Sequence, residues 1–370
     1  MDLHALLPRL ISKTGHIFPY HIALQRAVQS IGWRYHAYTP KKTDISPLPS
    51  CWKAVLANDL SETPKSIGQM LIFFLTNVFP FRKIFQEIEN KDSSVVFIEH
   101  FELHHLASIA FALIFLRPKF DFWILHRYEL EGKKLKGSLC RIFLRYMRWK
   151  LGTKKVKCFT DSDLLSKSLE VDLHCPIYVL PIPHTEGKWK GQKRHQEGNQ
   201  LWWWPGGLIR EEKGLCKIQL ILDRIKDNTK IQVVIAEKGR DFFGARPNIH
   251  FVKTFLSRDE YIEWMQKSDL ILLPYLQKDY SHRTSGIFVE AIILGSIPIV
   301  TRGTWMAYEL MKFDLIELIF QWDENDLIDR LHSIAEDFKI QMKLEKMRTD
   351  YRQFHSENGF AALLQHYLDK

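Results

Sequence analysis

A small-residue turn opens a short apolar helix in the second half of the chain and carries residues suited to holding a phosphorylated ligand. Ser285 and Gly286 precede a run in which apolar residues recur at helical spacing up to Leu294. The unpaired N–H groups of such a helix N-terminus, that of Ile287 included, and the helix dipole favour an anion such as a diphosphate. Glu290 follows about one turn later, where its carboxylate could accept hydrogen bonds from a sugar or ribose hydroxyl.

The residues around Glu290 resemble the donor site of the retaining glycosyltransferases of the GT-B fold. That family carries two glutamates separated by seven residues before a Gly-Xaa-Pro run, and Glu290 followed by Gly295-Ser296-Ile297-Pro298 is similar to the second half of the pattern. His282 stands where the first glutamate is expected, so the group that approaches the donor sugar in relatives is replaced here. We expect His282 and Arg283 to face phosphate or sugar.

A glycine turn after the first predicted strand of the second half supplies cations for the same ligand. Gly206 and Gly207 would let a ligand approach the backbone, and Arg210 and Lys213 would lie where a diphosphate needs positive charge. The resembling family has a similar turn followed by Lys-Gly, which Lys213 and the residue after it match. Its arginine usually stands five residues before that lysine, where this chain has a leucine, so Arg210 is expected to serve from a displaced position.

Two candidate positions lie in the first half of the chain. His126 follows a predicted strand, and ligands of open α/β sheets bind outside the carboxyl ends of strands. The resembling transferases commonly carry a histidine there, close to the donor sugar, which implies a catalytic role for His126 alongside Glu290. The turn after the first strand contains Gly15 and His16, and in the family this loop faces the acceptor side of the cleft.

The alternation of strands and helices predicts two doubly wound α/β domains that face a cleft, the GT-B fold. The predicted strands are 3–11, 33–38, 95–99, 122–125, 156–160, 177–180, 201–204, 231–236, 249–252, 270–273 and 297–300. The polar, basic segment 185–199 is the predicted linker. We expect an acceptor-side domain at 1–184, a donor-binding domain at 200–345, and helices within 346–370 that pack back toward the first domain.

Three further segments have local predictions. Residues 41–66 are expected to be irregular, and the apolar run 67–81 is expected to be interrupted at Pro80. The run Asp161-Ser162-Asp163 is expected to cap the helix that follows it.

The composition and charge of the chain indicate which class of protein it belongs to. The chain has 370 residues, 46% of them hydrophobic, with a net charge of +9, which fits a globular protein with two domains. Five scattered cysteines show no metal-ligand spacing and fit free thiols in a reducing compartment. The N-terminal residues lack the pattern of a signal peptide, and the two most apolar segments are shorter than the ~18–20 residues that span a bilayer. We therefore expect a cytoplasmic protein, without a metal site, that is soluble or bound to a membrane surface.

A basic amphipathic helix is predicted within 133–157. Its arginines, Arg141, Arg145 and Arg148, lie largely opposite an apolar face, an arrangement that suits an anionic bilayer, while a core helix with a solvated basic face remains an equal alternative. The sequence has no helix-turn-helix, zinc module or aromatic ribonucleoprotein signature, which argues against nucleic acid as a partner.

The resemblance implies a transferase that moves a sugar from a nucleotide-sugar donor to an acceptor hydroxyl with retention. The nucleotide-sugar would be a co-substrate, no tightly bound cofactor is implied, and a metal is not required if the cations suffice. A lipid-linked, envelope or surface glycan is the expected acceptor. Two alternatives stay open: a nucleotide-sugar epimerase or phosphorylase of the same fold, and a catalytically silent protein that docks on a membrane or a partner.

Overall fold

The computed structural model describes residues 1–13, 15–57, 66–89, 93–99, 101–129, 134–183, 199–207, 209–225 and 230–368. The chain divides into two compact units, one formed by Met1–His184 with His355–Lys370 and one formed by Thr185–Phe354. The predicted linker 185–199 lies outside the described residues except for its last residue.

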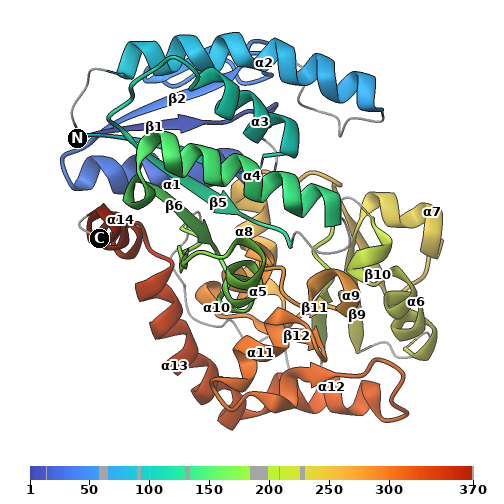
Figure 1. The fold of residues 1–370 in the computed structure, drawn as a ribbon. Coiled ribbons are helices and arrows are strands. Elements are labelled where there is room, and N and C mark those ends of the chain that lie inside the picture. Colours follow the sequence, from blue (N-terminus) through green and yellow to red (C-terminus); the bar gives the residue numbers. More distant parts are fainter. Residues whose placement is uncertain are drawn as a thin grey trace. The chain divides into compact units, whose positions relative to one another are not determined.

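The first unit contains a seven-stranded parallel sheet in the order β3-β2-β1-β4-β5-β6-β7 (Figure 1). Its strands are β1 (Asp2–Leu6), β2 (Arg34–Pro40), β3 (Trp52–Leu56), β4 (Ser94–Glu99), β5 (Asp121–His126), β6 (Val156–Thr160) and β7 (Ile177–Val179). The chain runs outward from β1 to β3 and then returns to place β4 beside β1. This reversal makes a topological switch point between β1 and β4, where ligands of such sheets bind.

The strand β3 lies inside the segment 41–66, so the prediction of an irregular segment was wrong there. The strand has only five residues, and its two half-buried residues give it neither a continuous apolar run nor a clean alternation. Tertiary contacts hold it instead, because it pairs with β2 and the Nε1 atom of Trp52 donates a hydrogen bond to Gln25 over 3.1 Å.

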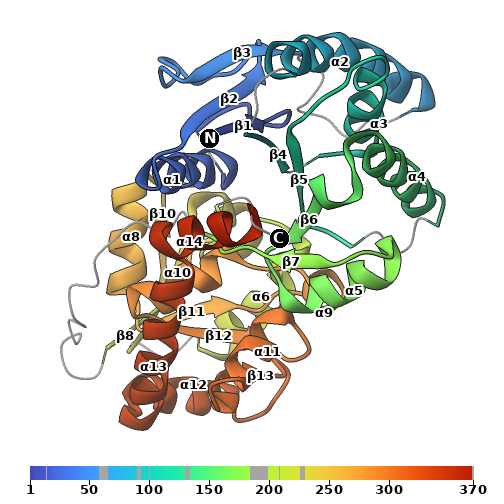
Figure 2. The same ribbon diagram turned by 60° about the vertical axis from the view of Figure 1, so that its left-hand side comes forward.

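Helices cover both faces of the first sheet (Figure 2). The face formed by Leu3 and Ala5 packs against α1 (Ile17–Ser30) and α14 (Glu357–Leu368), and the rings of Tyr20 and Phe360 join these two helices at 5.8 Å. The other face packs against α2 (Ile67–Ile88), α3 (Leu103–Ala112), α4 (Lys134–Leu151) and α5 (Asp163–Leu173).

Pro80 lies inside α2, which continues through it, so the predicted interruption is absent. The residues after the proline, Phe81, Ile84, Phe85 and Ile88, are buried in the core of the first unit. Tertiary packing of this face therefore outweighs the hydrogen bond that proline removes.

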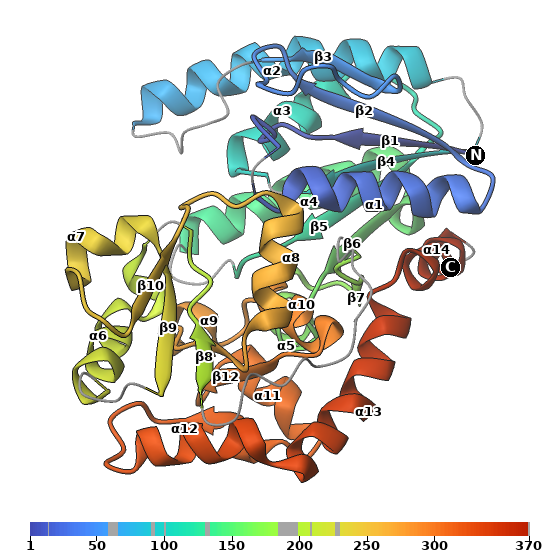
Figure 3. The same cartoon turned by 180° about the vertical axis from the view of Figure 1, so that it is seen from behind.

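The second unit contains a six-stranded parallel sheet in the order β10-β9-β8-β11-β12-β13 (Figure 3). Its strands are β8 (Gln200–Trp203), β9 (Ile231–Ala236), β10 (Ile249–Val252), β11 (Leu270–Leu273), β12 (Ile297–Thr301) and β13 (Ile319–Phe320). The central strands β11 and β12 are completely buried, as a parallel sheet covered on both faces requires. The switch point of this sheet lies between β8 and β11.

The principal helices of the second unit are α6 (Leu215–Arg224), α7 (Arg240–Phe243), α8 (Arg258–Lys267), α9 (Gln277–Tyr280), α10 (Gly286–Leu294), α11 (Trp305–Met311), α12 (Leu327–Glu336) and α13 (Phe338–Phe354). α13 packs on α10, since Arg348 Nε donates to the Ile292 carbonyl over 3.2 Å. The break between α13 and α14 contains His355, whose Nδ1 atom accepts a hydrogen bond from the Ile182 amide at 3.0 Å. Of the residues 346–370, only those from His355 onward therefore belong to the first unit.

Within the described ranges, no helix combines the length and the apolar character needed to cross a membrane.

Candidate functional site

The switch point of the second sheet brings two loops together. The loop after β8 leads into a short 3-10 turn, Glu211–Lys213, and the loop after β11 begins with Pro274 and Tyr275. The Leu276 amide donates to the Glu212 carbonyl over 2.9 Å, so the two loops are joined through the backbone. The predicted cations and the predicted start of α10 therefore lie on neighbouring loops at the carboxyl edge of this sheet.

A row of cations and aromatic rings occupies these loops. Lys213 Nζ lies 6.0 Å from the centre of the Tyr275 ring, which in turn lies 4.5 Å from the Tyr280 ring. The guanidinium of Arg283 lies 4.9 Å from the centre of the Tyr280 ring. Arg210 is more exposed and forms an ion pair of 3.5 Å with Glu212.

The pKa of Lys213 reflects both its burial and the positive charges beside it. Burial, as the largest cause, and the charges of Arg210 and Arg283 together lower the pKa of Lys213 from 10.5 to about 8, against the opposing charge of Glu212. The field at this amine therefore favours the arrival of an anion.

The helix α10 begins beside this row of cations, as predicted. Ser285 is the N-cap residue, and its hydroxyl accepts a hydrogen bond from the Phe288 amide over 3.3 Å. In the first turn, helix geometry leaves the N–H groups of Gly286 and Ile287 without intrahelical partners. Both residues are half-buried, so their amides can add to the positive potential that the neighbouring side chains create.

Glu290 is buried on α10 and turned toward α8. Its carboxylate lies 2.8 Å from the Arg258 guanidinium, and that guanidinium lies 5.3 Å from the centre of the Tyr261 ring. Burial and the neighbouring Glu290 carboxylate raise the pKa of Tyr261 well above its usual range. Glu290 therefore has a charged partner on α8, which the sequence did not reveal.

The glycines of the turn after β8 have packing roles. A Cβ atom on Gly207 would lie 2.7 Å from the carbonyl oxygen of Thr254, while one on Gly206 would make ordinary contacts with Trp204 and the stem of Lys213. Gly214 has a φ of +86°, and a Cβ there would lie 2.0 Å from the Pro274 carbonyl oxygen. Gly214 thus permits the close approach of the two loops.

His126 is the last residue of β5 and is buried on the sheet face that α3 and α4 cover. Its ring packs edge-on against Phe101 at 5.2 Å, and its Nε2 atom has no hydrogen-bonding partner among the described residues. Burial, with a smaller effect from the charge of Arg148, lowers the pKa of His126 to about 4. The imidazole is therefore neutral at physiological pH.

A buried charge cluster that the sequence reasoning missed occupies the opposite face of the same sheet edge. Arg127 Nη2 donates to Glu99 and Arg127 Nη1 donates to Asp161, each over 2.6 Å. His21 Nε2 lies 3.1 Å from Glu99, and the Arg127 guanidinium lies 4.8 Å from the Tyr20 ring centre. Glu99, Arg127 and Asp161 each stand at the end of a strand, so the parallel topology brings them together.

Within the predicted cap Asp161-Ser162-Asp163, the capping residue is Ser162. Ser162 is the N-cap residue of α5 and accepts a hydrogen bond from the Leu165 amide over 3.1 Å, whereas Asp161 pairs with Arg127. Burial alone would raise the pKa of Glu99, but the charges of Arg127 and His21 outweigh it and hold that pKa well below its usual range.

Gly15 and His16 lie in the loop between β1 and α1, beside the switch point of the first sheet. Gly15 has a φ of +87°, and His16 occupies the N-cap position of α1. Both are exposed, and the charge of His16 is one of the causes that lower the pKa of Glu99. The loop is thus near the buried charge cluster.

The three arginines of α4 point in different directions. Arg141 donates to the Asp172 carbonyl over 2.9 Å, and Arg148 lies 3.8 Å from the Cys158 sulfur, so both turn toward the body of the first unit. Arg145 is exposed.

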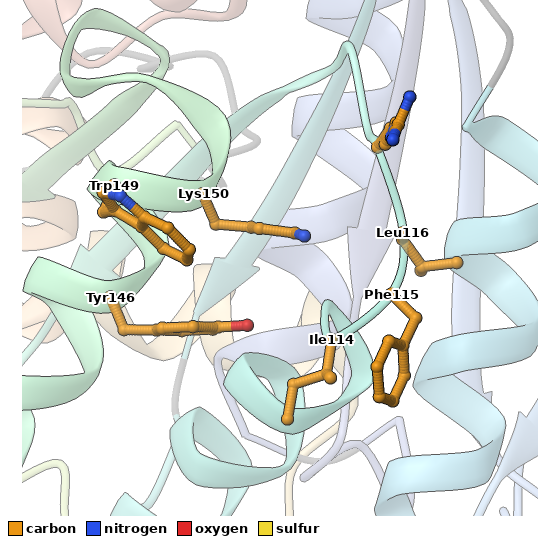
Figure 4. Close-up of a pocket in the computed structure, with 7 residues that line it drawn as sticks. Ile114, Phe115, Leu116, Tyr146, Trp149 and Lys150 are labelled. Atoms are coloured by element: carbon orange, nitrogen blue, oxygen red, sulfur yellow. The ribbon is translucent and has the colours of Figure 1, made fainter.

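A shallow hollow of about 450 Å³ lies beside α4. Figure 4 shows Tyr146, Trp149 and Lys150 on α4 facing the segment that follows α3. From that segment, Ile114, Phe115, Leu116 and Arg117 line the hollow.

No protein-family profile matches the chain, and no curated protein sequence matches it. Several solved structures, by contrast, match the chain over its whole length. Sucrose-phosphate synthase from Thermosynechococcus elongatus has a TM-score of 0.66 at 13% identity, with 100% of this chain and 98% of that chain covered. A trehalose-6-phosphate synthase has a TM-score of 0.68 at 10% identity, covering 100% and 99%. An α-glucosyltransferase in complex with UDP has a TM-score of 0.58 at 12% identity, covering 100% and 99%.

The likeness extends over the whole of both chains, and each sheet of this protein is parallel and doubly wound. Two such units in one chain are the architecture that the sequence predicted. The chain therefore has the GT-B fold of these glycosyltransferases.

Proposed function

We propose that this protein is a glycosyltransferase that uses a nucleotide-sugar donor, which the second unit binds. The observation that carries the proposal is the group of cations, Lys213, Arg210 and Arg283, beside the start of α10 at the switch point of the second sheet. A nucleoside diphosphate supplies the anion that this potential favours. Solved proteins of the same fold include an α-glucosyltransferase in complex with UDP, which supports this ligand class.

In the proposed reaction, the acceptor hydroxyl oxygen forms a bond to the anomeric carbon as the bond from that carbon to the diphosphate breaks. The electron pair of the broken bond leaves with the phosphate oxygen, and the hydroxyl proton passes to that oxygen. Attack from the leaving-group face retains the anomeric configuration. Lys213, Arg210 and the amides of Gly286 and Ile287 would stabilise the charge on the departing diphosphate, and if these groups suffice the chemistry would need no metal.

Two other residues have proposed roles toward the donor. Glu290 would accept a hydrogen bond from a ribose hydroxyl, with Arg258 holding its carboxylate in place. His126 is neutral and would serve as a hydrogen-bonding group beside the transferred sugar. His282, which stands where the family carries a glutamate, would contact the sugar or phosphate from the loop before α10.

The acceptor would bind at the carboxyl edge of the first sheet. Gly15 and His16 form an exposed loop at its switch point, and open α/β sheets bind ligands there. The Glu99–Arg127–Asp161 cluster holds three strand ends of this edge in fixed positions and would make the acceptor-binding surface rigid.

Titration with uridine, guanosine, adenosine, cytidine and thymidine diphosphates and their sugars tests the donor site. We expect one base to raise the melting temperature of the purified chain, and Lys213→Ala to abolish the shift. Lys253→Ala is the matched control, because Lys253 is an exposed lysine of the same unit paired with Glu260. No shift with any nucleotide, or equal shifts in both variants, would refute the donor site.

Product analysis distinguishes the alternatives. A transferase consumes the donor only when an acceptor is present and forms a new glycosidic bond. An epimerase converts the donor sugar alone, a phosphorylase needs inorganic phosphate, and a silent docking protein leaves every donor unchanged.

We also propose that the first unit docks on an anionic membrane, which would suit a lipid-linked or envelope acceptor on a cytoplasmic surface. Large apolar side chains of α2 are exposed, among them Ile67, Leu71, Ile72, Leu75 and Phe79. The adjoining helices add Phe111 on α3, which touches Phe74 of α2 at a ring distance of 4.9 Å.

The hollow beside α4 combines aromatic and cationic groups in one place. Phe115 is 85% exposed and Trp149 is 78% exposed, while Arg117 and Lys150 line the same hollow. Aromatic rings favour the bilayer interface, and the cations would bind the phosphates of anionic lipids. The hollow beside α4 therefore supports membrane docking better than Arg141, Arg145 and Arg148, the arginines that the sequence indicated.

Co-sedimentation with vesicles of phosphatidylglycerol and phosphatidylcholine tests this surface. We expect Trp149→Ala combined with Phe115→Ala to abolish binding, and Lys150→Glu to weaken it more at low than at high salt. Val171→Ser on α5 is the matched control, because it removes an exposed apolar side chain elsewhere on the same unit. Binding that survives the double substitution would exclude this surface.

A further inference from the structure

Three potential metal ligands meet near the amino ends of β1 and β2, far along the strands from the carboxyl edge described above. The strands pair in parallel, with Asp2 opposite Arg34 and His4 opposite His36. Residues two apart along a strand share a face, so Asp2, His4 and His36 lie on one face of the sheet. Asp2 and His4 are buried, while the His36 side chain keeps 32% of its exposure.

The distances place the three side chains around one point. Each offers one ligand atom, and these atoms all lie within 4.8 Å of one another. His36 Nε2 lies 3.9 Å from Asp2 Oδ2, and the rings of His4 and His36 are nearly parallel with centroids 4.9 Å apart. Coordination would need these atoms to close by roughly 1 Å, since Zn–N and Zn–O bonds are about 2.0–2.2 Å long. His36 has the exposure to make that movement.

Outer hydrogen bonds already orient two of the three ligands. His4 Nδ1 lies 3.1 Å from the hydroxyl of Tyr38, which holds the ring with its Nε2 atom directed away from Tyr38. Arg34 donates to both oxygens of Asp2, over 2.7 Å and 3.0 Å. Metal-binding histidines and carboxylates characteristically have such partners. Each carboxylate oxygen keeps a further lone pair for a metal.

We propose that Asp2, His4 and His36 bind one divalent transition-metal ion of the zinc class. Two imidazoles and one carboxylate suit Zn²⁺, Ni²⁺ or Cu²⁺, whereas Mg²⁺ and Ca²⁺ prefer sites made of oxygen atoms. Water would complete the coordination from the exposed side of His36. The ion would join β1 to β2 and stabilise the first unit, independently of the donor site.

The sequence could not show this site, because the three residues lack a recognised metal-binding spacing. Asp2 and His4 form only a short pair on one strand, and His36 follows more than thirty residues later, with β2. The strand register alone brings them together. The competing explanation is an ordinary interaction between the Asp2 carboxylate and the two histidines, with no metal.

The proposal is tested by measuring the zinc affinity of the full chain. A chelator first strips the protein of metal, and zinc is then titrated in competition with a chromophoric chelator. We expect one high-affinity equivalent, and at least a hundredfold weaker binding in His36→Gln, whose part-exposed position should leave folding intact. Tyr38→Phe, which removes only the outer hydrogen bond, should weaken binding by about 10–100-fold. His250→Gln, an exposed histidine of the second unit, is the control.

A second readout uses Co²⁺, whose visible absorption reports nitrogen and oxygen ligands. The wild-type spectrum should be lost in His4→Gln and His36→Gln and kept in His250→Gln. The proposal is overturned if the stripped wild-type chain binds no zinc, or if His36→Gln binds it as tightly as the wild type.

Discussion

Replacing Lys213 by methionine is expected to stabilise the ligand-free protein while abolishing nucleotide binding. Burial, the first cause, and the charges of Arg210 and Arg283 lower the pKa of Lys213 from 10.5 to about 8, partly offset by Glu212. At about 1.36 kcal/mol per pKa unit, holding this charged amine in the folded chain costs about 3 kcal/mol at neutral pH, an upper limit because the side chain is only half-buried.

The pH dependence has a definite sign. Between pH 8 and 10.5 the unfolded chain keeps the proton that the folded chain has lost, so wild-type stability rises with pH across this interval. Lys213→Met should remove that rise and increase the melting temperature at pH 7 by several degrees. Methionine keeps an unbranched stem against Tyr275 and Gly206, so little packing is lost.

Nucleotide affinity should change in the opposite sense. A bound diphosphate would raise the pKa of Lys213, so the wild-type affinity should fall by up to about tenfold per pH unit above pH 8. Differential scanning fluorimetry and calorimetry at pH 7, 8, 9 and 10 measure both effects, with Lys253→Met as the exposed control. A lower melting temperature of Lys213→Met at pH 7, or nucleoside diphosphate binding as tight as that of the wild type, would contradict this role of Lys213.

Three further predictions concern particular side chains. Glu99→Gln should lower the free energy of unfolding by about 3–5 kcal/mol, because Arg127 stays buried with one carboxylate fewer. Since the folded pKa of Glu99 is depressed, acid denaturation should show the full wild-type advantage above pH 4.5 and its progressive loss as the pH falls from 4.5 toward the folded pKa. Gly214→Ala should lower the free energy of unfolding, measured by urea denaturation, by several kcal/mol. Gly152→Ala is the control, because Gly152 also has a positive φ but no atom lies within 4 Å of the added carbon, and it should cost only about 1–2 kcal/mol. The pKa of Cys175 is lowered to about 6 by the neighbouring Cys158 thiol and by Arg148, against the effect of burial. The rate at which Cys175 reacts with iodoacetamide should therefore rise with pH with a midpoint near pH 6. A midpoint near pH 9 would contradict this.

The strands of the fold were largely predictable because a buried parallel strand is a nearly continuous run of apolar residues in the sequence. Val156–Thr160, Ile231–Ala236 and Leu270–Leu273 have the predicted bounds, and each is buried along nearly its whole length. α10 was predictable for a second reason, since Ser285 and Gly295 mark its two ends. Local residue patterns therefore suffice where a segment's burial and caps are set by its own residues.

The remaining features depend on residues far apart in the chain. The β3 strand is held by β2 and by Gln25, and α2 continues through Pro80 because the residues after it are buried in the core. The ion pair of Glu290 with Arg258 joins two helices, with no signal in either segment alone. Such contacts require the topology of the sheet before any residue pattern can indicate them.

The charge groups at the carboxyl edges of the two sheets show why the strand ends should be compared with one another. Glu99, Arg127 and Asp161 each look like ordinary polar residues after a strand, but the parallel order β4-β5-β6 places the three strand ends side by side. Lys213 and Arg283 belong to loops after β8 and β11, which are adjacent in the second sheet although β9 and β10 lie between them in sequence. In both sheets the strand order turns scattered charges into one group, and in the second sheet that group has the sign that a diphosphate requires.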